Sequence, residues 1–199
     1  MLRVALTGGI ATGKSHILAQ LASLDIPIID ADALVHELMK PGAAVTAAVV
    51  ARFGAGVQQP DGSVDRKRLG ALVFADAAAR RDLEAIVHPA VYEAIASWLA
   101  RLDAEGTHAF AVADVPLLYE TGRAGEFDRV IVAACPPEMQ LARIVARDGL
   151  SETEATQRLA AQWPIGQKID LADFVIRTDG TFEETNRRVE EIVGVLEGE

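Results

Sequence analysis

Positive charge and cysteine are both scarce in this sequence. Its 199 residues include 19 Lys and Arg against 29 Asp and Glu, which gives a formal net charge of -10. This deficit of positive charge disfavours a general nucleic-acid-binding role, because such a role requires a basic face. The single cysteine, Cys135, cannot form an internal disulfide and favours a reducing compartment.

Long hydrophobic runs are also missing. No stretch approaches the roughly 18 consecutive apolar residues that a membrane helix needs. The N-terminal MLRVALTGG reaches a glycine-rich turn after one short apolar segment, which is unlike a signal peptide. Half of the residues are hydrophobic, which excludes a disordered chain and allows a proper core. We expect a cytoplasmic globular protein with no nucleic-acid partner, no membrane partner and no obligate protein partner.

Short apolar segments alternate along the chain with segments of helical periodicity. The five segments that predict strands are Leu2–Thr7, Ile26–Ile29, Phe110–Val115, Val130–Ala134 and Phe174–Ile176. Helices are predicted at Lys14–Leu24, Ala31–Met39, Ala43–Phe53, Arg66 to about Asp103, Pro137–Asp148, Glu152–Gln162, Ile165–Ala172 and Phe182–Leu196. This alternation predicts an α/β fold with a parallel sheet covered on both faces.

The helical region before Phe110 is longer than one crossover between strands requires. It predicts a small helical subdomain inserted into the core. One internal break is expected at His88-Pro89, because proline disfavours helix at the residue before it.

The strongest functional motif is Gly8-Gly9-Ile10-Ala11-Thr12-Gly13-Lys14-Ser15, which matches G-x-x-x-x-G-K-[ST] between a predicted strand and a predicted helix. The glycines allow a tight turn that points backbone N–H groups inward, and the helix N-terminus adds donors for a phosphate. We expect Lys14 to reach the β- and γ-phosphates and the Ser15 hydroxyl to hold Mg²⁺. The N–H of His16 is expected at the α-phosphate. The candidate nucleotide-binding residues are Gly8, Gly9, Ala11, Thr12, Gly13, Lys14, Ser15 and His16.

This loop indicates a nucleoside triphosphate but not the reaction. A GTP switch would normally carry an N-K-x-D motif, and the only asparagine, Asn186, lies in the last predicted helix. A small chain with a helical insertion and arginines late in the sequence is typical of a kinase that phosphorylates a small molecule.

Acidic residues follow two of the predicted strands, at the sheet edge where open α/β proteins bind ligands. Asp30 and Asp32 come directly after the second strand. We expect Asp30 to cap the next helix and Asp32 to act as the catalytic carboxylate that orients a hydroxyl and accepts its proton. Asp114 ends the third strand and is a candidate Mg²⁺ ligand through water, although a simple strand end is an equal alternative.

Further candidates are basic and apolar side chains later in the chain. Arg143 and Arg147 are four residues apart, so one helix face could present both guanidinium groups to the phosphates as catalytic residues. Arg158 and Lys168 add positive charge to the same region, and the alternative is a solvated face paired with Asp148, Glu152 or Glu154. His88, Leu117 and Glu120 are the remaining candidates for substrate contact.

The combination of motifs resembles the dephospho-CoA kinase family. The resemblance rests on LTGGIATGKS (Leu6–Ser15), IIDAD (Ile28–Asp32), PGA (Pro41–Ala43), FG (Phe53-Gly54), HP (His88-Pro89), DVPLLYE (Asp114–Glu120) and RIVARD (Arg143–Asp148), in this order across nearly the whole chain. It implies ATP-dependent phosphorylation of the ribose 3′-hydroxyl of dephospho-CoA, which yields coenzyme A and ADP as the last step of coenzyme A biosynthesis. Asp32 matches the family's proposed base, and Arg143 and Arg147 match its lid arginines.

The resemblance also implies a P-loop kinase fold of three α/β/α layers with a five-stranded parallel sheet. We expect residues 1–199 to form a single P-loop kinase domain, with a helical CoA-binding insertion at about 58–106 and a mobile lid at about 140–168. Two residues depart from the family pattern: Ala11 replaces a usual glycine, and His16 replaces a usual threonine. The alternatives are another small-molecule kinase, such as a nucleoside monophosphate kinase, and a non-catalytic nucleotide-binding regulator.

Overall fold

The computed structural model describes residues 1–199 and divides into two compact units. The sheet unit comprises Met1–Ile29 and Arg101–Glu199, and the helical unit comprises Asp30–Ala100. The insertion expected at about 58–106 falls largely within the helical unit. Its part in substrate binding stays a prediction.

The central feature of the sheet unit is a five-stranded sheet in the order β2-β3-β1-β4-β5. Its strands are β1 (Leu2–Gly8), β2 (Ile28–Asp30), β3 (Phe110–Asp114), β4 (Arg129–Ala134) and β5 (Phe174–Arg177). β1 pairs in parallel with both β3 and β4, so that Leu6 lies opposite Asp114 on one side and Ile131 on the other. The predicted α/β class and the five-stranded parallel sheet are confirmed. The carboxyl ends of the strands therefore share one edge, and their following loops meet there.

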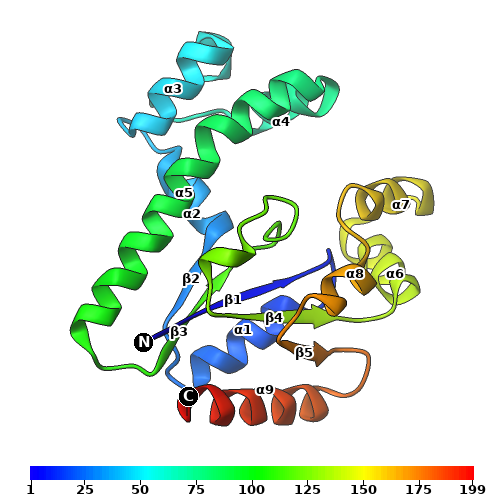
Figure 1. Ribbon diagram of the computed structural model, residues 1–199. Coiled ribbons are helices and arrows are strands. Elements are labelled where there is room, and N and C mark those ends of the chain that lie inside the picture. Colours follow the sequence, from blue (N-terminus) through cyan, green and yellow to red (C-terminus); the bar gives the residue numbers. More distant parts are fainter. The chain divides into compact units, whose positions relative to one another are not determined.

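One face of the sheet is covered by α1 (Lys14–Ser23) and α9 (Phe182–Glu197), as Figure 1 shows. Val4 and Leu6 of β1 and Ile131 of β4 point into a fully buried cluster that includes Ile17 of α1 and Ile192 of α9. α9 begins with a capping box, in which the side chains of Thr181 and Glu184 satisfy each other's backbone N–H groups. Because β1 is covered on both faces, its sequence is a continuous apolar run rather than an alternating one.

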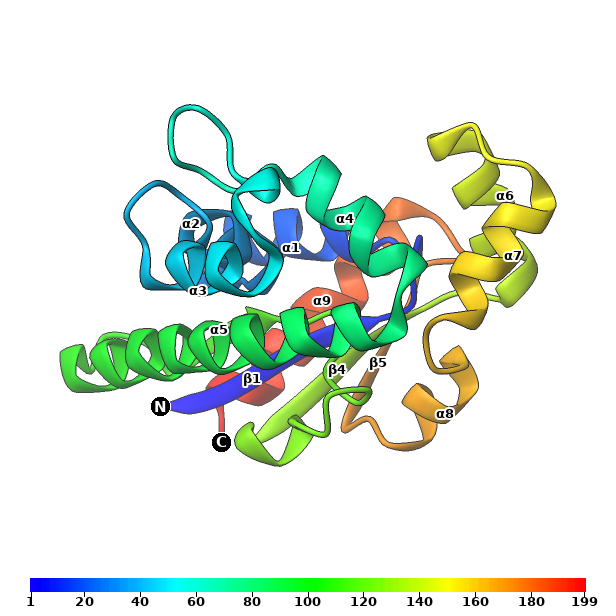
Figure 2. The ribbon, with the colours of Figure 1, turned by 90° about the horizontal axis from the view of Figure 1, so that it is seen from above.

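The other face of the sheet meets α8 (Ile165–Asp170), which lies against β4. Thr7 Oγ1, on the face away from Leu6, donates to Pro116 O, and the same carbonyl accepts from Lys168 of α8. α6 (Pro137–Asp148) and α7 (Glu152–Ala160) lie side by side beyond the carboxyl end of β4 (Figure 2). A short 3₁₀ turn, η2 (Ala124–Glu126), precedes β4.

The helical unit contains α2 (Ala31–Leu38), α3 (Ala44–Phe53), the 3₁₀ turn η1 (Ala55–Val57), α4 (Arg66–Ala75) and most of α5 (Ala77–Glu105). A turn at residues 59–63 connects η1 to α4, and Asp61 fixes it by accepting from the backbone N–H of Ser63. An ion pair between Arg52 and Asp82 joins α3 to α5. No helix of the structure combines the length and the apolar character that a membrane crossing demands.

The predicted helix break at His88-Pro89 is wrong, because α5 continues through Pro89. Buried side chains on both sides of the proline, Val87, Val91 and Tyr92, hold the helix together across the hydrogen bond that proline cannot donate. The break lies instead at Asp76, which separates α4 from α5. Its carboxylate accepts from the N–H of Ala78 at 2.7 Å and so caps α5.

Candidate active site

The phosphate loop connects β1 to α1 and has two residues with positive φ. Gly13 has φ 83, and Ala11 has φ 59, which places an alanine in the left-handed region that favours glycine. Gly8 is required for space, because a Cβ atom there would lie 2.7 Å from the carbonyl oxygen of Ala133. The sequence motif therefore specifies the loop, and Ala11 is its one strained position.

Side chains from outside the loop bind its carbonyl groups. Gln140 Nε2 donates to Ile10 O at 2.7 Å, Arg143 Nη1 to Ala11 O at 3.2 Å, and Thr178 Oγ1 to Thr12 O at 2.7 Å. The N–H groups of Lys14 and Ser15 lie in the first turn of α1, where a helix offers its N–H groups no intrahelical acceptors. Such free N–H donors at a glycine-rich loop suit a phosphate chain.

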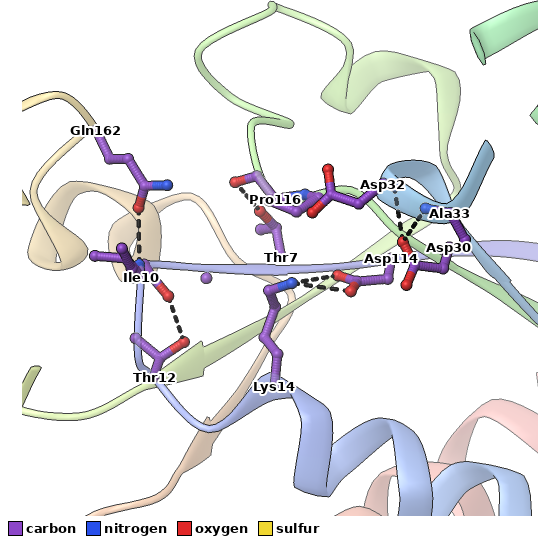
Figure 3. Close-up of polar contacts among 12 residues, drawn as sticks. Thr7, Ile10, Thr12, Lys14, Asp30, Asp32, Ala33, Asp114, Pro116 and Gln162 are labelled. Carbon is purple, nitrogen blue, oxygen red and sulfur yellow. Dashed lines mark hydrogen bonds and ion pairs between the residues drawn. The ribbon is translucent and has the colours of Figure 1, made fainter. Parts of the chain in front are cut away.

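Lys14 and Asp114 form a tight ion pair at this sheet edge (Figure 3). Lys14 Nζ lies 2.7 Å from Asp114 Oδ1 and 2.9 Å from Oδ2. The two side chains are 16% and 6% exposed, so the carboxylate is almost fully buried beside the ammonium group. The structure thus brings together the predicted phosphate-binding lysine and the predicted metal-binding carboxylate.

His16 turns its ring away from the loop. Its Nε2 lies 2.7 Å from Asn186 Oδ1, and its ring packs at 4.5 Å from the ring of Phe182. Its backbone N–H, expected at the α-phosphate, donates to Gly13 O at 3.1 Å. The imidazole of His16 therefore serves contacts with α9.

Asp30 and Asp32 take different positions at the start of α2. Asp30 is the N-cap and accepts from the N–H groups of Asp32 and Ala33 at 2.7 and 3.1 Å, as Figure 3 shows, which confirms its expected capping role. The side chain of Asp32 lies in the first turn of α2, is exposed and has no hydrogen-bond partner. This carboxylate is therefore available to an external group.

The two arginines of α6 have different partners. Besides Ala11 O, Arg143 donates to Thr178 O at 2.7 Å, and it contacts Cys135 Sγ at 3.5 Å. Burial raises the pKa of the Cys135 thiol, so it stays protonated at neutral pH. Arg147 is exposed and forms an ion pair with Asp148 at 2.7 Å. Arg158 also pairs with Asp148, at 2.9 Å. Arg143 thus holds the phosphate loop, whereas Arg147 lies on the solvated face.

The remaining candidates are dispersed. Leu117 is partly exposed in the loop after β3, and His88 lies in α5 in the helical unit. Glu120 has its contacts within the sheet unit, where its Oε1 lies 2.8 Å from Lys168 Nζ. Lys168, which was expected to add positive charge to this region, is fully buried and pairs with that carboxylate. The roles of His88, Leu117 and Glu120 in substrate binding stay predictions.

Sequence reasoning missed three residues that shape the loop. Thr178 directly follows β5, and its position at the carboxyl edge of a predicted parallel strand was a usable signal. Gln140 is buried within α6, and Gln162 Oε1 accepts from the N–H of Ile10 at 2.8 Å. Nothing in the sequence distinguishes these two glutamines from surface residues of an amphipathic helix.

The glycine loop between β1 and α1, with Lys14 at the carboxyl edge of a parallel sheet, defines a nucleotide-binding protein of the P-loop kinase class. Comparison with known proteins specifies it further. The family model described as dephospho-CoA kinase matches residues 2–184, and the chain belongs to this family. It is therefore a phosphotransferase rather than a nucleotide-binding regulator.

Individual relatives agree with this assignment over nearly the whole chain. A dephospho-CoA kinase from Anaeromyxobacter dehalogenans is 47% identical over 195 residues, which cover 98% of this chain and 92% of the relative. One from Geobacillus kaustophilus is 42% identical, covering 94% and 93%. The solved structure of dephospho-CoA kinase from Campylobacter jejuni superimposes with a TM-score of 0.76 at 28% identity, covering 98% of this chain and 97% of that one.

Proposed function

We propose that this chain transfers the γ-phosphoryl group of ATP to the ribose 3′-hydroxyl of dephospho-CoA, and that Asp32 accepts the proton of that hydroxyl. Membership in the dephospho-CoA kinase family supports the reaction. The observation that carries the site is the phosphate loop with the Lys14–Asp114 pair at the carboxyl ends of β1 and β3.

The loop and Lys14 hold the triphosphate. Backbone N–H groups of Gly13, Lys14 and Ser15 bind the phosphate oxygens, and the Lys14 ammonium, 2.7 Å from Asp114, neutralises charge on the β- and γ-phosphates. Gln140, Arg143 and Thr178 hold the loop by its carbonyl oxygens, and Asp114 holds Lys14. Such preorganisation lowers the cost of reorganisation during transfer.

The donor set also suits Mg²⁺. Ser15 supplies a hydroxyl oxygen and Asp114 a carboxylate, which are hard ligands of the kind that Mg²⁺ prefers. No group of three or more His, Cys, Asp or Glu side chains forms a cage, and Mg²⁺ in such sites takes most of its ligands from phosphates and water. When bound, Mg²⁺ neutralises charge on the transferred phosphoryl group. We propose Ser15 and Asp114 as its protein ligands.

Asp32 acts on the acceptor. In the transfer step, the 3′-oxygen forms a bond to the γ-phosphorus, and the bond between this phosphorus and the β–γ bridging oxygen breaks. The proton of the hydroxyl passes to the Asp32 carboxylate, which is exposed and unpartnered in the first turn of α2. A carboxylate suits this role because it both orients the oxygen and accepts the proton late in a loose transition state.

Two arginines complete the proposed site. Arg143 maintains the shape of the loop through Ala11 O and Thr178 O and adds positive charge next to it. Arg147 would exchange its exposed pairing with Asp148 for a phosphate oxygen when the region of about 140–168 closes over the nucleotide. Closure excludes water, which would otherwise compete with the ribose hydroxyl. We place the enzyme in the cytoplasm, acting on a small-molecule substrate.

Replacing Asp32 tests the assignment of the base. We expect Asp32→Asn to lower kcat for coenzyme A formation by about 10²- to 10⁴-fold, the usual contribution of a general base. Glu37→Gln is the matched control: it removes one exposed carboxylate from the same helix and should leave kcat unchanged. Near-normal turnover of Asp32→Asn, measured by mass spectrometry of the product, would exclude Asp32 as the base.

A further inference from the structure

Lys168 is a fully buried lysine whose three ammonium hydrogens all have acceptors. Its Nζ lies 2.8 Å from Glu120 Oε1, 3.2 Å from Gly8 O and 3.3 Å from Pro116 O. A buried ammonium group is costly unless it is paired and fully hydrogen-bonded, and here both conditions hold. One side chain therefore joins α8 to two other segments of the sheet unit, the end of β1 and the loop after β3.

Two of these segments border the nucleotide site. Gly8 is the last residue of β1, from which the phosphate loop departs. Pro116 and Glu120 follow Asp114, the carboxylate paired with Lys14. The Lys168 ammonium thus fixes the distance between the base of the phosphate loop and the segment that carries the partner of Lys14.

The loop after β3, which contains Tyr119 and Glu120, is also bound by residues just before and just after α8. Before α8, the backbone N–H of Trp163 donates to Glu120 Oε1 at 2.9 Å, and the Trp163 ring stacks on Tyr119 at 6.3 Å between centroids. After α8, Tyr119 Oη donates to Leu171 O at 3.0 Å. Burial raises the pKa of Tyr119 to about 12, so its hydroxyl stays protonated as this donor. We call Lys168, Glu120, Tyr119 and Trp163 the α8 latch.

The latch lies next to the point where the α6–α7 region returns to the phosphate loop. Gln162, the residue before Trp163, accepts from the N–H of Ile10 at 2.8 Å. At the other end of the region, Gln140 binds Ile10 O. The two glutamines therefore bind the backbone of Ile10 on both sides of its Cα, Gln162 at the N–H and Gln140 at the carbonyl oxygen, so a displacement of Trp163 would move Gln162 away from the loop.

The Lys168–Glu120 ion pair leaves one polar atom without a partner in the protein. Glu120 Oε2 is buried and has no hydrogen-bond partner. An unsatisfied buried carboxylate oxygen costs stability, and an apolar pair of the same size would often be at least as stable. The chain therefore retains a charged arrangement that stability alone does not favour.

We propose that Lys168 and Glu120 are positioning residues for phosphoryl transfer: they fix the end of the α6–α7 region against the phosphate loop, so that Gln162 holds the Ile10 peptide. This inference rests on the proposed function. Its consequence is that loss of the latch lowers kcat and releases phosphate to water, because the region of about 140–168 no longer closes in one geometry.

The test compares the double variant Lys168→Met/Glu120→Gln with the wild type. This variant removes the buried charges with little change in volume. We expect a fall in kcat of about tenfold to a hundredfold, the range for a misplacement near 1 Å, with less than a threefold change in the KM for dephospho-CoA and a rise in the ratio of ADP to coenzyme A above one. The matched control, Arg188→Met/Glu191→Gln, removes an exposed ion pair of α9 and should change none of these quantities.

A second variant tests the same proposal if the double variant does not fold. Tyr119→Phe removes only the hydroxyl that binds Leu171 O and should lower kcat severalfold in the same direction. In a Trp98→Phe background, Trp163 is the only tryptophan, and we expect Tyr119→Phe to increase its quenching by acrylamide. Unchanged kcat, unchanged ADP-to-CoA ratio and unchanged quenching in folded latch variants would overturn the inference while leaving the proposed function intact. A wild type that forms no coenzyme A would instead refute both.

Discussion

Ala11 is the residue of the phosphate loop whose backbone conformation is unfavourable for its side chain. The sequence alone marks alanine as acceptable only at negative φ or with mild strain, and the structure places it at φ 59. Three side chains around it, including Arg143 and Thr178, over-determine this conformation. An L-residue in the left-handed region costs about 1–2 kcal/mol, which the surrounding contacts offset.

Replacing Ala11 with glycine should therefore stabilise the protein. Relief of strain exceeds the entropy that glycine adds to the unfolded chain, and we expect a net gain of roughly 0.5 kcal/mol in the free energy of unfolding. Ala51→Gly, at an exposed position of α3, should instead cost about 1 kcal/mol. Denaturant unfolding checks both, and a loss of stability in Ala11→Gly as large as that in Ala51→Gly would contradict the strain.

At the scale of elements, the sequence predicted every strand and almost every helix within a few residues. Apolar runs ending at polar residues specify buried parallel strands well, because both faces of each strand are covered. The exception is α5, where the rule for proline gave the wrong break. Buried side chains on both sides of Pro89 keep the helix continuous there, and the cap at Asp76 sets its start. Only the cap is visible in the sequence, as a typical N-cap residue.

Pro89→Ala should raise the free energy of unfolding by roughly 2 kcal/mol. Alanine supplies the backbone N–H that proline lacks in the interior of α5, which stabilises the helix. This gain is larger than the loss of stability that comes from the greater entropy of the unfolded chain with alanine. The measurement is urea unfolding with coenzyme A formation assayed in parallel. A decrease in stability would show that the helix at Pro89 is bent in a way that only proline accommodates.

The starts of β1 and β4 are joined by an ion pair that makes stability depend on pH. Arg3 donates to both carboxylate oxygens of Asp128, at 3.0 and 2.7 Å, and this lowers the pKa of Asp128 to about 2. A carboxylate with a lowered pKa in the folded state stabilises the protein above its ordinary pKa of 3.8, and the contribution disappears as the pH falls toward 2.

Asp128→Asn should therefore lower the free energy of unfolding by about 1 kcal/mol at pH 7, a value that allows for partial exposure of the pair. The difference from the wild type should shrink between pH 4 and 2, in the window set by the two pKa values. The control is Glu93→Gln, which removes an exposed carboxylate of α5 that lies outside this ion pair. A constant difference between pH 7 and pH 2 would exclude the ion pair as its source.

For the whole molecule, the sequence predicted the class of reaction from one loop and the order of several motifs. It could not predict which side chains hold the loop, because Gln140 of α6, Gln162 between α7 and α8, and Lys168 of α8 lie far along the chain and reach it only through the tertiary fold. It also could not predict that Lys168 is buried, since a lysine in a helix is usually exposed.

Variants of Lys14 and Asp32 should differ in their effect on nucleotide binding. Mg·ATP at a hundred times its Kd should stabilise the wild type by about 2.7 kcal/mol, which raises Tm by roughly 5–10 °C for a chain of this size. Lys14→Ala should lose most of this shift, whereas Asp32→Asn should keep it, because Asp32 acts on the acceptor. Differential scanning fluorimetry measures the shift, and an equal loss in both variants would place Asp32 in the nucleotide site.

The most direct measurement is ADP release from Mg·ATP by the purified chain, with and without dephospho-CoA, with the product identified by mass and by phosphorus NMR. The account predicts release that depends on dephospho-CoA, one coenzyme A formed for each ADP, and the new phosphate on the ribose 3′-oxygen. Release at the same slow rate with or without dephospho-CoA would contradict it.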